Sequence, residues 1–172
     1  MGRGDSAVNH KSGSCTRPAN TTQYTANDAI SDSASAPSAI EIEEAARSPG
    51  YGGSILGLQV LSSANQATLP QLEVYVFDRE PTPTNDNAEF GLTDADAANL
   101  VGLFVVNSFY DLDVTTGANG NAAGFAQAEG GFPPAFKCAS GSQSLWALLK
   151  VLNAYTPVSG EIFTVTPHLL QE

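Results

Sequence analysis

The acidic side chains of the chain are its first candidates for chemistry, because two facing carboxylates can act as general acid and base. Close pairs occur at Glu43 and Glu44, at Asp94 and Asp96, and at Asp111 and Asp113. Asp94 and Asp96 equally suit the first turn of a helix, where negative charge is favourable. Asp111 and Asp113 alternate along an extended segment, so both would point to one solvated face. None of these spacings requires an active site.

The histidines and cysteines give no catalytic motif. Nucleophilic catalysis needs a base beside Ser or Cys. His10 lies near the N-terminus and His168 follows Pro167 near the C-terminus, and no motif surrounds either. Cys15 and Cys138 are too few for a disulfide framework and lack the spacing of metal ligands. We therefore expect two free thiols and no Ser/His/Asp or Cys/His constellation.

Glycine-rich and acidic loop motifs for ligands are also missing from the sequence. It contains no GxGxxG or GxxxxGK[ST] phosphate loop and no calcium-binding loop pattern. Gly50, Gly52 and Gly53 around Tyr51 are better explained as a hairpin-like connection. The Arg-Gly-Asp sequence at residues 3–5 is short enough to recur by chance. We expect no enzyme and no catalytic, cofactor-binding or metal site, with a cation between subunits as the alternative.

The composition is acidic and poor in charge. Asp and Glu number 18 against 7 Lys and Arg, for a net charge of −11, and charged residues make up only 15% of the chain. This sign of charge repels phosphate backbones and anionic lipid, so neither nucleic acid nor a membrane is an expected partner. No stretch approaches the roughly 20 apolar residues of a membrane span, and no apolar leader opens the chain. We expect synthesis in a reducing cytoplasm.

The first 22 residues differ in composition from the rest of the chain. Residues 1–22 are rich in Gly, Ser, Asn and Thr, and beyond Met1 their only sizeable aliphatic side chain is Val8. Such a segment cannot offset its own ordering entropy, which predicts a flexible N-terminal arm, either disordered or ordered on a neighbouring subunit. Residues 23–172 alternate short apolar runs with turn signals and form the predicted domain.

The pattern over the domain predicts an all-β fold, a jelly-roll-like β-sandwich with a short helix. In the clearest strand, 72–78, Leu72, Val74 and Val76 share one face, and the run 54–61 places Leu56, Leu58 and Val60 on one face. Further strands are predicted at 39–43, 100–106, 161–166 and, in preference to a helix, 145–152. Thr93 is the predicted N-cap of a helix of one or two turns. Residues 111–141, with six glycines, predict a long contact loop.

Three blocks carry a resemblance to a known family. They are residues 24–31 (Tyr-Thr-Ala-Asn-Asp-Ala-Ile-Ser), residues 63–78 together with 85–96, and residues 153–161 (Asn-Ala-Tyr-Thr-Pro-Val-Ser-Gly-Glu). Together they resemble small virion structural proteins of tailed bacteriophages and prophages, over roughly residues 24–166. The resemblance implies a capsid decoration, or cement, protein that binds the outer surface of the major capsid shell as a trimer and stabilises it. The arm would pair with edge strands of the coat protein. Such a protein is made in the host bacterial cytoplasm and resides on the virion.

Two other functions stay open at this stage. A head-fibre, tail or baseplate module that binds a host receptor or glycan would use exposed aromatics such as Tyr110, Phe125 and Phe132. A carbohydrate-acting enzyme on a jelly-roll scaffold would need a carboxylate pair such as Asp111 and Asp113. Four more aromatics are candidate anchors, with a core position expected for each: Tyr75, Phe77, Trp146 and Tyr155.

Overall fold

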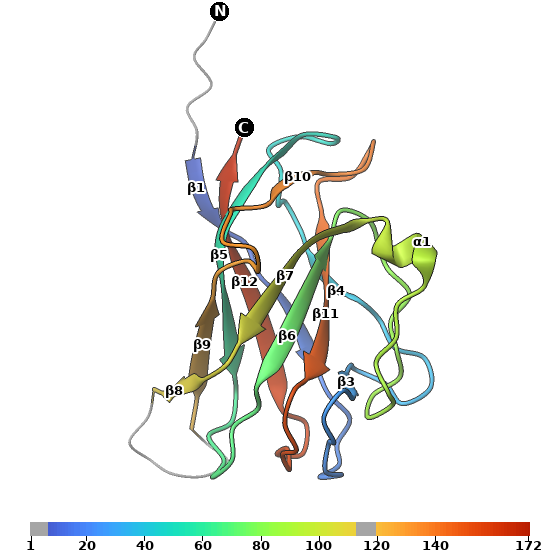
Figure 1. The fold of residues 1–172 in the computed structure, drawn as a ribbon, viewed down its shortest axis with the longest axis vertical. Coiled ribbons are helices and arrows are strands. Elements are labelled where there is room, and N and C mark those ends of the chain that lie inside the picture. Colours follow the sequence, from blue (N-terminus) through green and yellow to red (C-terminus); the bar gives the residue numbers. More distant parts are fainter. Residues whose placement is uncertain (1–6, 113–119) are drawn as a thin grey trace, which may run out of the picture.

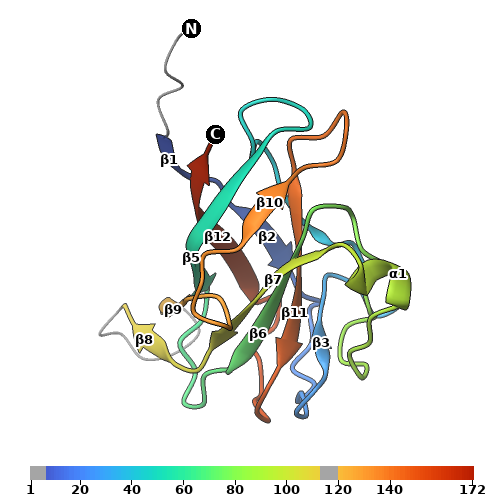
Figure 2. The ribbon, with the colours of Figure 1, turned by 45° about the horizontal axis from the view of Figure 1, so that its top comes forward.

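The computed structural model describes residues 7–112 and 120–172, which fold as two packed antiparallel sheets (Figure 1). One sheet has seven strands, in the order β1-β12-β5-β9-β8, with β10 also beside β5 and β2 also beside β12. Its strands are β1 (Ala7–His10), β2 (Gly13–Thr16), β5 (Gly52–Ser62), β8 (Phe109–Asp111), β9 (Ala122–Ala126), β10 (Ala135–Lys137) and β12 (Ile162–Gln171). Figure 2 shows β10 lying along β5.

The second sheet has five strands, in the order β3-β11-β6-β7, with β4 also beside β11. Its strands are β3 (Ala29–Ile30), β4 (Ile40–Ile42), β6 (Leu72–Phe77), β7 (Leu100–Val106) and β11 (Leu145–Val151). A single-turn helix, α1 (Asp94–Ala97), precedes β7. This arrangement confirms the predicted all-β sandwich. In the described part of the chain no helix is long and apolar enough to cross a membrane.

The core lies between the sheets and follows from strict alternation along the strands. In β12, Phe163, Val165, Pro167 and Leu169 are buried, while the residues that alternate with them reach solvent. Across the core, Leu72 and Val74 of β6 are fully buried. Each such side chain removed from water contributes about 1.5–3 kcal/mol before the entropy of ordering is subtracted. The alternation is therefore the main driving force for closing the two sheets on each other.

Most of the predicted strands and the helix are confirmed. The strands predicted at 72–78, 100–106 and 145–152 are β6, β7 and β11, and 161–166 is the first part of a longer β12. The helix begins at its predicted N-cap, because the Thr93 side chain accepts a hydrogen bond from the Asp96 amide at 3.1 Å. The choice of a strand over a helix for β11 is correct because it pairs with β6, β3 and β4.

The predicted face of β5 is wrong at one position. Leu58 and Val60 are buried as expected, but Leu56 is 42% exposed and Ile55 takes the inward position. The cause is an irregularity in the pairing of β5 with β12, where Gly57 pairs with His168 and Ile55 pairs with Leu169. Leu56 is thus an extra residue on β5. A bulge of this kind shifts every later side chain to the opposite face.

The prediction of a flexible arm is wrong for residues 7–16. β1 and β2 pair antiparallel with β12, and Cys15 is buried in the core. Arg17, two residues after Cys15, is also buried. Backbone hydrogen bonds to β12 supply what the segment lacks in apolar side chains, so the sandwich begins before residue 23. Residues 1–6 lie outside the described residues.

The predicted long contact loop at 111–141 is also wrong in part, because β9 and β10 lie within it. The sequence pattern does not reveal β9 because its buried residues, Ala122, Ala123 and Gly124, are small. A Cβ at Gly124 would lie 2.2 Å from Val106 Cγ1, so only glycine permits β9 to approach that side chain. Residues 113–119, including Asp113, lie outside the described residues.

Candidate functional site

The outward face of the seven-stranded sheet is almost free of charge. Its register brings Thr166 of β12 beside Gln59 of β5, and Gln59 beside Phe125 of β9. One step along, Thr164 lies beside Leu61. The outward positions of β12 are Ile162, Thr164, Thr166, His168 and Leu170, and those of β5 after its bulge are Gln59 and Leu61. None of them is Asp, Glu, Lys or Arg, although the chain carries a net charge of −11.

Large apolar side chains gather at the β8 and β9 end of this face. Tyr110 pairs with Ala123, and Phe125 lies two residues further along the same strand, so the two rings share the outward side. Tyr110 is 63% exposed, Phe125 55% and Leu112 58%. We call Tyr110, Leu112 and Phe125 the aromatic patch. In Figures 1 and 2, β8 and β9 lie on the side of the molecule away from α1.

The outward face of the five-stranded sheet is different in kind. Lys150 of β11 and Glu73 of β6 face each other and form an ion pair of 2.9 Å. The Tyr75 hydroxyl donates to Glu73 at 2.7 Å, and the Tyr75 ring stacks on Phe90. This face thus carries paired charge and is partly covered by the segment between β6 and β7. The two sheets therefore present unlike surfaces to solvent.

The four aromatics expected in the core take different places. Phe77 and Tyr155 are fully buried, which confirms their core position. Tyr75 is half-buried against Phe90, and Trp146 is half-buried opposite Phe77 on β6. None of the four is an exposed anchor. Of the three aromatics predicted to be exposed, Tyr110 and Phe125 lie in the aromatic patch and Phe132 lies in the connection between β9 and β10.

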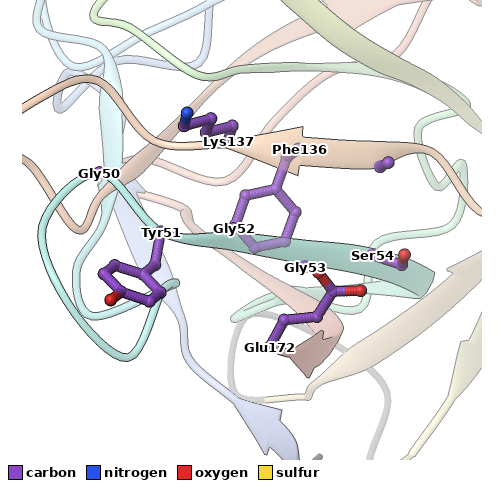
Figure 3. A pocket seen from close by; sticks show the side chains of 9 residues that line it. Gly50, Tyr51, Gly52, Gly53, Ser54, Phe136, Lys137 and Glu172 are labelled. Atoms are coloured by element: carbon purple, nitrogen blue, oxygen red, sulfur yellow. The ribbon is translucent and has the colours of Figure 1, made fainter.

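An open groove of about 500 Å³ lies at the start of β5 (Figure 3). It is lined by residues 50–54 and 135–137 and by Glu172. In the view of Figure 3 the Phe136 ring lies between Lys137 and Glu172, with Tyr51 at one end. The groove offers one exposed aromatic ring, one cation and one carboxylate. These groups could bind a polar ligand, but they supply no nucleophile with a base beside it.

The glycines of this groove permit the close approach of strands rather than a phosphate cradle. A Cβ at Gly52 would lie 2.0 Å from the Phe136 carbonyl oxygen, and one at Gly53 would lie 2.1 Å from that of Leu170. Gly50 has φ +76 in the turn that leads into β5. The predicted hairpin-like connection is therefore a turn followed by a strand that closes on β10 and β12.

A polar network is buried where the chain leaves β2. Arg17 Nε donates to the Tyr24 hydroxyl at 2.8 Å, and Arg17 Nη1 donates to the Asn20 carbonyl at 2.9 Å. The Tyr24 hydroxyl donates in turn to Asp86 Oδ1 at 2.5 Å. Burial, followed by this bond to Asp86, raises the pKa of Tyr24 well above its ordinary value. Since Arg17 is only 1% exposed, the network holds the fold together and does not meet a substrate.

Two of the predicted pairs each have one carboxylate with a structural partner, Glu44 and Asp96. Glu44 forms an ion pair with Lys11, which lowers the pKa of Glu44. Asp96 accepts hydrogen bonds from the Thr93 hydroxyl and the Thr82 amide, and these bonds lower its pKa. Asp111 is the last residue of β8. Among residues 7–112 and 120–172 no group of three or more His, Cys, Asp or Glu could hold a metal ion.

The contact between His10 and His168 could not be predicted from any local pattern in the sequence. His10 of β1 pairs with His168 of β12, and their ring centroids lie 4.6 Å apart with an interplanar angle of 75°. The two residues are far apart in the chain, and only the pairing of β1 with β12 brings them together.

The comparisons with known proteins add no relative: no protein-family model matches the chain, and no curated protein matches it.

Proposed function

We propose that this chain is a non-enzymatic structural protein of a bacteriophage particle, a capsid decoration protein that binds the outer surface of the major capsid shell. The sequence resemblance supplies the biological setting. The observation that supports a binding role is the outward face of β12 and of β5 after its bulge, which lacks Asp, Glu, Lys and Arg and leads to the aromatic patch. Interface cores are depleted in charged residues and enriched in Tyr and Phe, as this face is.

The proposed mechanism is burial of this face against the shell. Tyr110 and Phe125 would lose water from their rings on docking, and large aromatics of this kind dominate interface energetics. A protein that binds only the assembled shell shifts the equilibrium toward the shell by mass action. Exposed acidic side chains outside this face, such as Glu43 and Asp94, would face solvent or basic coat residues. Self-association as a trimer is part of this proposal.

The test is cosedimentation of the full-length chain with undecorated, expanded heads. Removal of the first 22 residues is unsuitable because it would take β1 and β2 out of the sandwich. Instead, Tyr110→Ser and Phe125→Ser are compared with Tyr51→Ser and Phe132→Ser, which remove exposed aromatics outside the patch. We expect saturable binding that raises the melting temperature of the heads. The patch variants should weaken binding about tenfold or more, corresponding to about 1.4 kcal/mol each, and the controls should not.

A second candidate is a head-fibre, tail or baseplate module for a host receptor or glycan. The groove beside Tyr51 favours it, because an exposed ring with neighbouring polar groups suits a sugar. Retention on host envelopes that is lost in Tyr51→Ser, with no binding to heads at micromolar concentration, would replace the decoration role by this one.

Equal binding to heads by the patch variants and the wild type would reject the proposed face.

A further inference from the structure

A pair of imidazoles lies at the junction of the first and last strands. His10 and His168 are direct cross-strand partners in an antiparallel pair, so their side chains leave the sheet on the same face. That face is the solvent side, because His10 is exposed and His168 alternates with the buried Pro167 and Leu169. Figure 1 shows β1 and β12 side by side near the chain ends.

The distance between the rings is short enough for a shared ion. Imidazole nitrogens bind zinc at about 2.0–2.1 Å, so two nitrogens on one ion lie no more than about 4 Å apart. Rings with centroids 4.6 Å apart reach this separation by rotation of the side chains alone. The backbone therefore already places two ligands for one metal ion.

The surroundings leave room for the rest of a coordination sphere. On its other side, His168 pairs with Gly57, which has no side chain. Even a Cβ built there would meet only the Ala126 carbonyl oxygen, at 3.4 Å. The β5 bulge at Leu56 adjoins this position, and bulges often re-aim neighbouring side chains at functional sites. No lysine or arginine occupies the outward positions of β5 and β12 beside the pair, and the charge of Lys11, which follows His10, is paired with Glu44.

We propose that His10 and His168 form a two-imidazole site for a divalent transition-metal ion, and that the ion clips β1 to β12. The protein supplies two nitrogen ligands, and water or a group from a second molecule supplies the others. Imidazole ligands select copper, nickel and zinc over calcium and magnesium, with copper bound most tightly. This inference does not depend on the decoration role.

The experiment uses the full-length chain with Cu²⁺, Ni²⁺ or Zn²⁺ alone. Cu²⁺ at one equivalent should give an electron paramagnetic resonance spectrum with hyperfine coupling to two nitrogens. Zn²⁺ or Ni²⁺ should raise the melting temperature, because an ion that binds only the folded chain stabilises it, and excess EDTA should reverse the shift. His10→Asn and His168→Asn should each weaken metal binding by at least about tenfold. Loss of a residue that only hydrogen-bonds to a metal ligand already costs about tenfold in affinity, and loss of the ligand itself costs no less.

Asn9→Ala is the matched control. It changes β1 at the adjacent position, where Asn9 Nδ2 donates to Gln171 Oε1 at 3.5 Å, and it leaves both imidazoles in place. Metal binding should survive in this variant. Melting curves in EDTA establish that each variant folds before metal is added. The inference is overturned if millimolar metal leaves the wild-type spectrum and melting temperature unchanged, or if either histidine variant binds as tightly as the wild type.

Discussion

Arg17 and Asp86 form an ion pair inside the sandwich, with Arg17 Nη2 3.5 Å from Asp86 Oδ2 and both side chains almost fully excluded from water. The Tyr24 hydroxyl bridges them, since it accepts from Arg17 and donates to Asp86. Asp86 also accepts a hydrogen bond from the Ser31 amide. The pair therefore fixes the segment after β2 to the distant loop of Asp86, and Arg17 Nη1 also donates to the Val158 carbonyl oxygen at 3.3 Å.

Arg17→Met should destabilise the fold strongly. Removing one partner of a buried ion pair leaves the other charge uncompensated, which costs about 3–5 kcal/mol. Urea denaturation measures the loss. Arg79→Met is the control, because Arg79 is exposed, and it should change the free energy of unfolding by no more than about 0.5 kcal/mol. Equal stability of the two variants would show that Arg17 does not anchor this segment.

The thiol of Cys15 tests the position of β2 directly. Burial, together with the charges of Asp32 and Asp86, raises the pKa of Cys15 to about 12, and burial raises that of Cys138 to about 11. At pH 8 neither thiol is ionised or accessible, so a thiol reagent should label the native chain slowly and label both sites rapidly in urea. Fast labelling of Cys15 alone in the native chain would mean that β2 detaches from β12.

Gly13→Ala should also loosen the N-terminal strands. A Cβ at Gly13 would lie 2.2 Å from the Glu41 carbonyl oxygen, so the backbone of β2 or β4 must move. Overpacking of this kind costs about 1–3 kcal/mol. At Gly91 a Cβ meets nothing within 4 Å, so Gly91→Ala should stabilise the fold by up to about 1 kcal/mol. Thermal unfolding of the two variants gives the comparison, and a stable Gly13→Ala would contradict the close approach of β2 to β4.

Glu161 should make the stability of the fold depend on pH. Burial raises the pKa of this carboxyl above 4.5, although the Ser62 hydroxyl and the Gln66 amide donate to it and act in the opposite direction. When the pKa of a carboxyl is higher in the folded state than in the unfolded state, the protonated carboxyl stabilises the fold. This stabilisation is complete at pH values below the unfolded-state pKa and is lost as the pH rises through the folded-state pKa.

Glu161→Gln removes this titration and keeps a similar shape. Because Gln66 Oε1 is buried without a hydrogen-bond partner, it can accept from the amide that the substitution introduces. The free energy of unfolding of Glu161→Gln relative to wild type should therefore rise as the pH increases above 4.5, while other carboxyls cancel in the difference. Denaturation at several pH values measures it. A difference that is flat or falls with pH would contradict a raised pKa at Glu161.

Short apolar runs bounded by turn signals, alternating in face most clearly in β6, were enough to predict most of the core strands. β6 and β7 could be located because their buried positions are occupied by large apolar residues such as Leu72 and Phe104. The cap at Thr93 was equally predictable, since the side chain and the amide that it accepts from are three residues apart. These features depend on residues close together in the chain, and hydrophobic periodicity and capping signals are read from such short stretches.

Features that depend on distant pairing were not predictable in this way. β1 and β2 contain few large apolar residues, and their order comes from backbone bonds to β12 and from the buried Arg17. The β5 bulge depends on how β12 pairs with it, so the outward position of Leu56 has no local signal. The same holds for the aromatic patch, because Tyr110 and Phe125 become neighbours only through the pairing of β8 with β9.

The pairing of Ala7 with Gln171 has a consequence for protein engineering. Because these two positions face each other in adjacent antiparallel strands, only about one strand spacing, roughly 5 Å, separates them. A short Gly-Ser peptide could join them, and the chain could then be opened in an exposed turn such as that at Gly130 and Gly131. Such a circular permutant would keep every strand pair of the seven-stranded sheet while moving its termini to a new part of the surface.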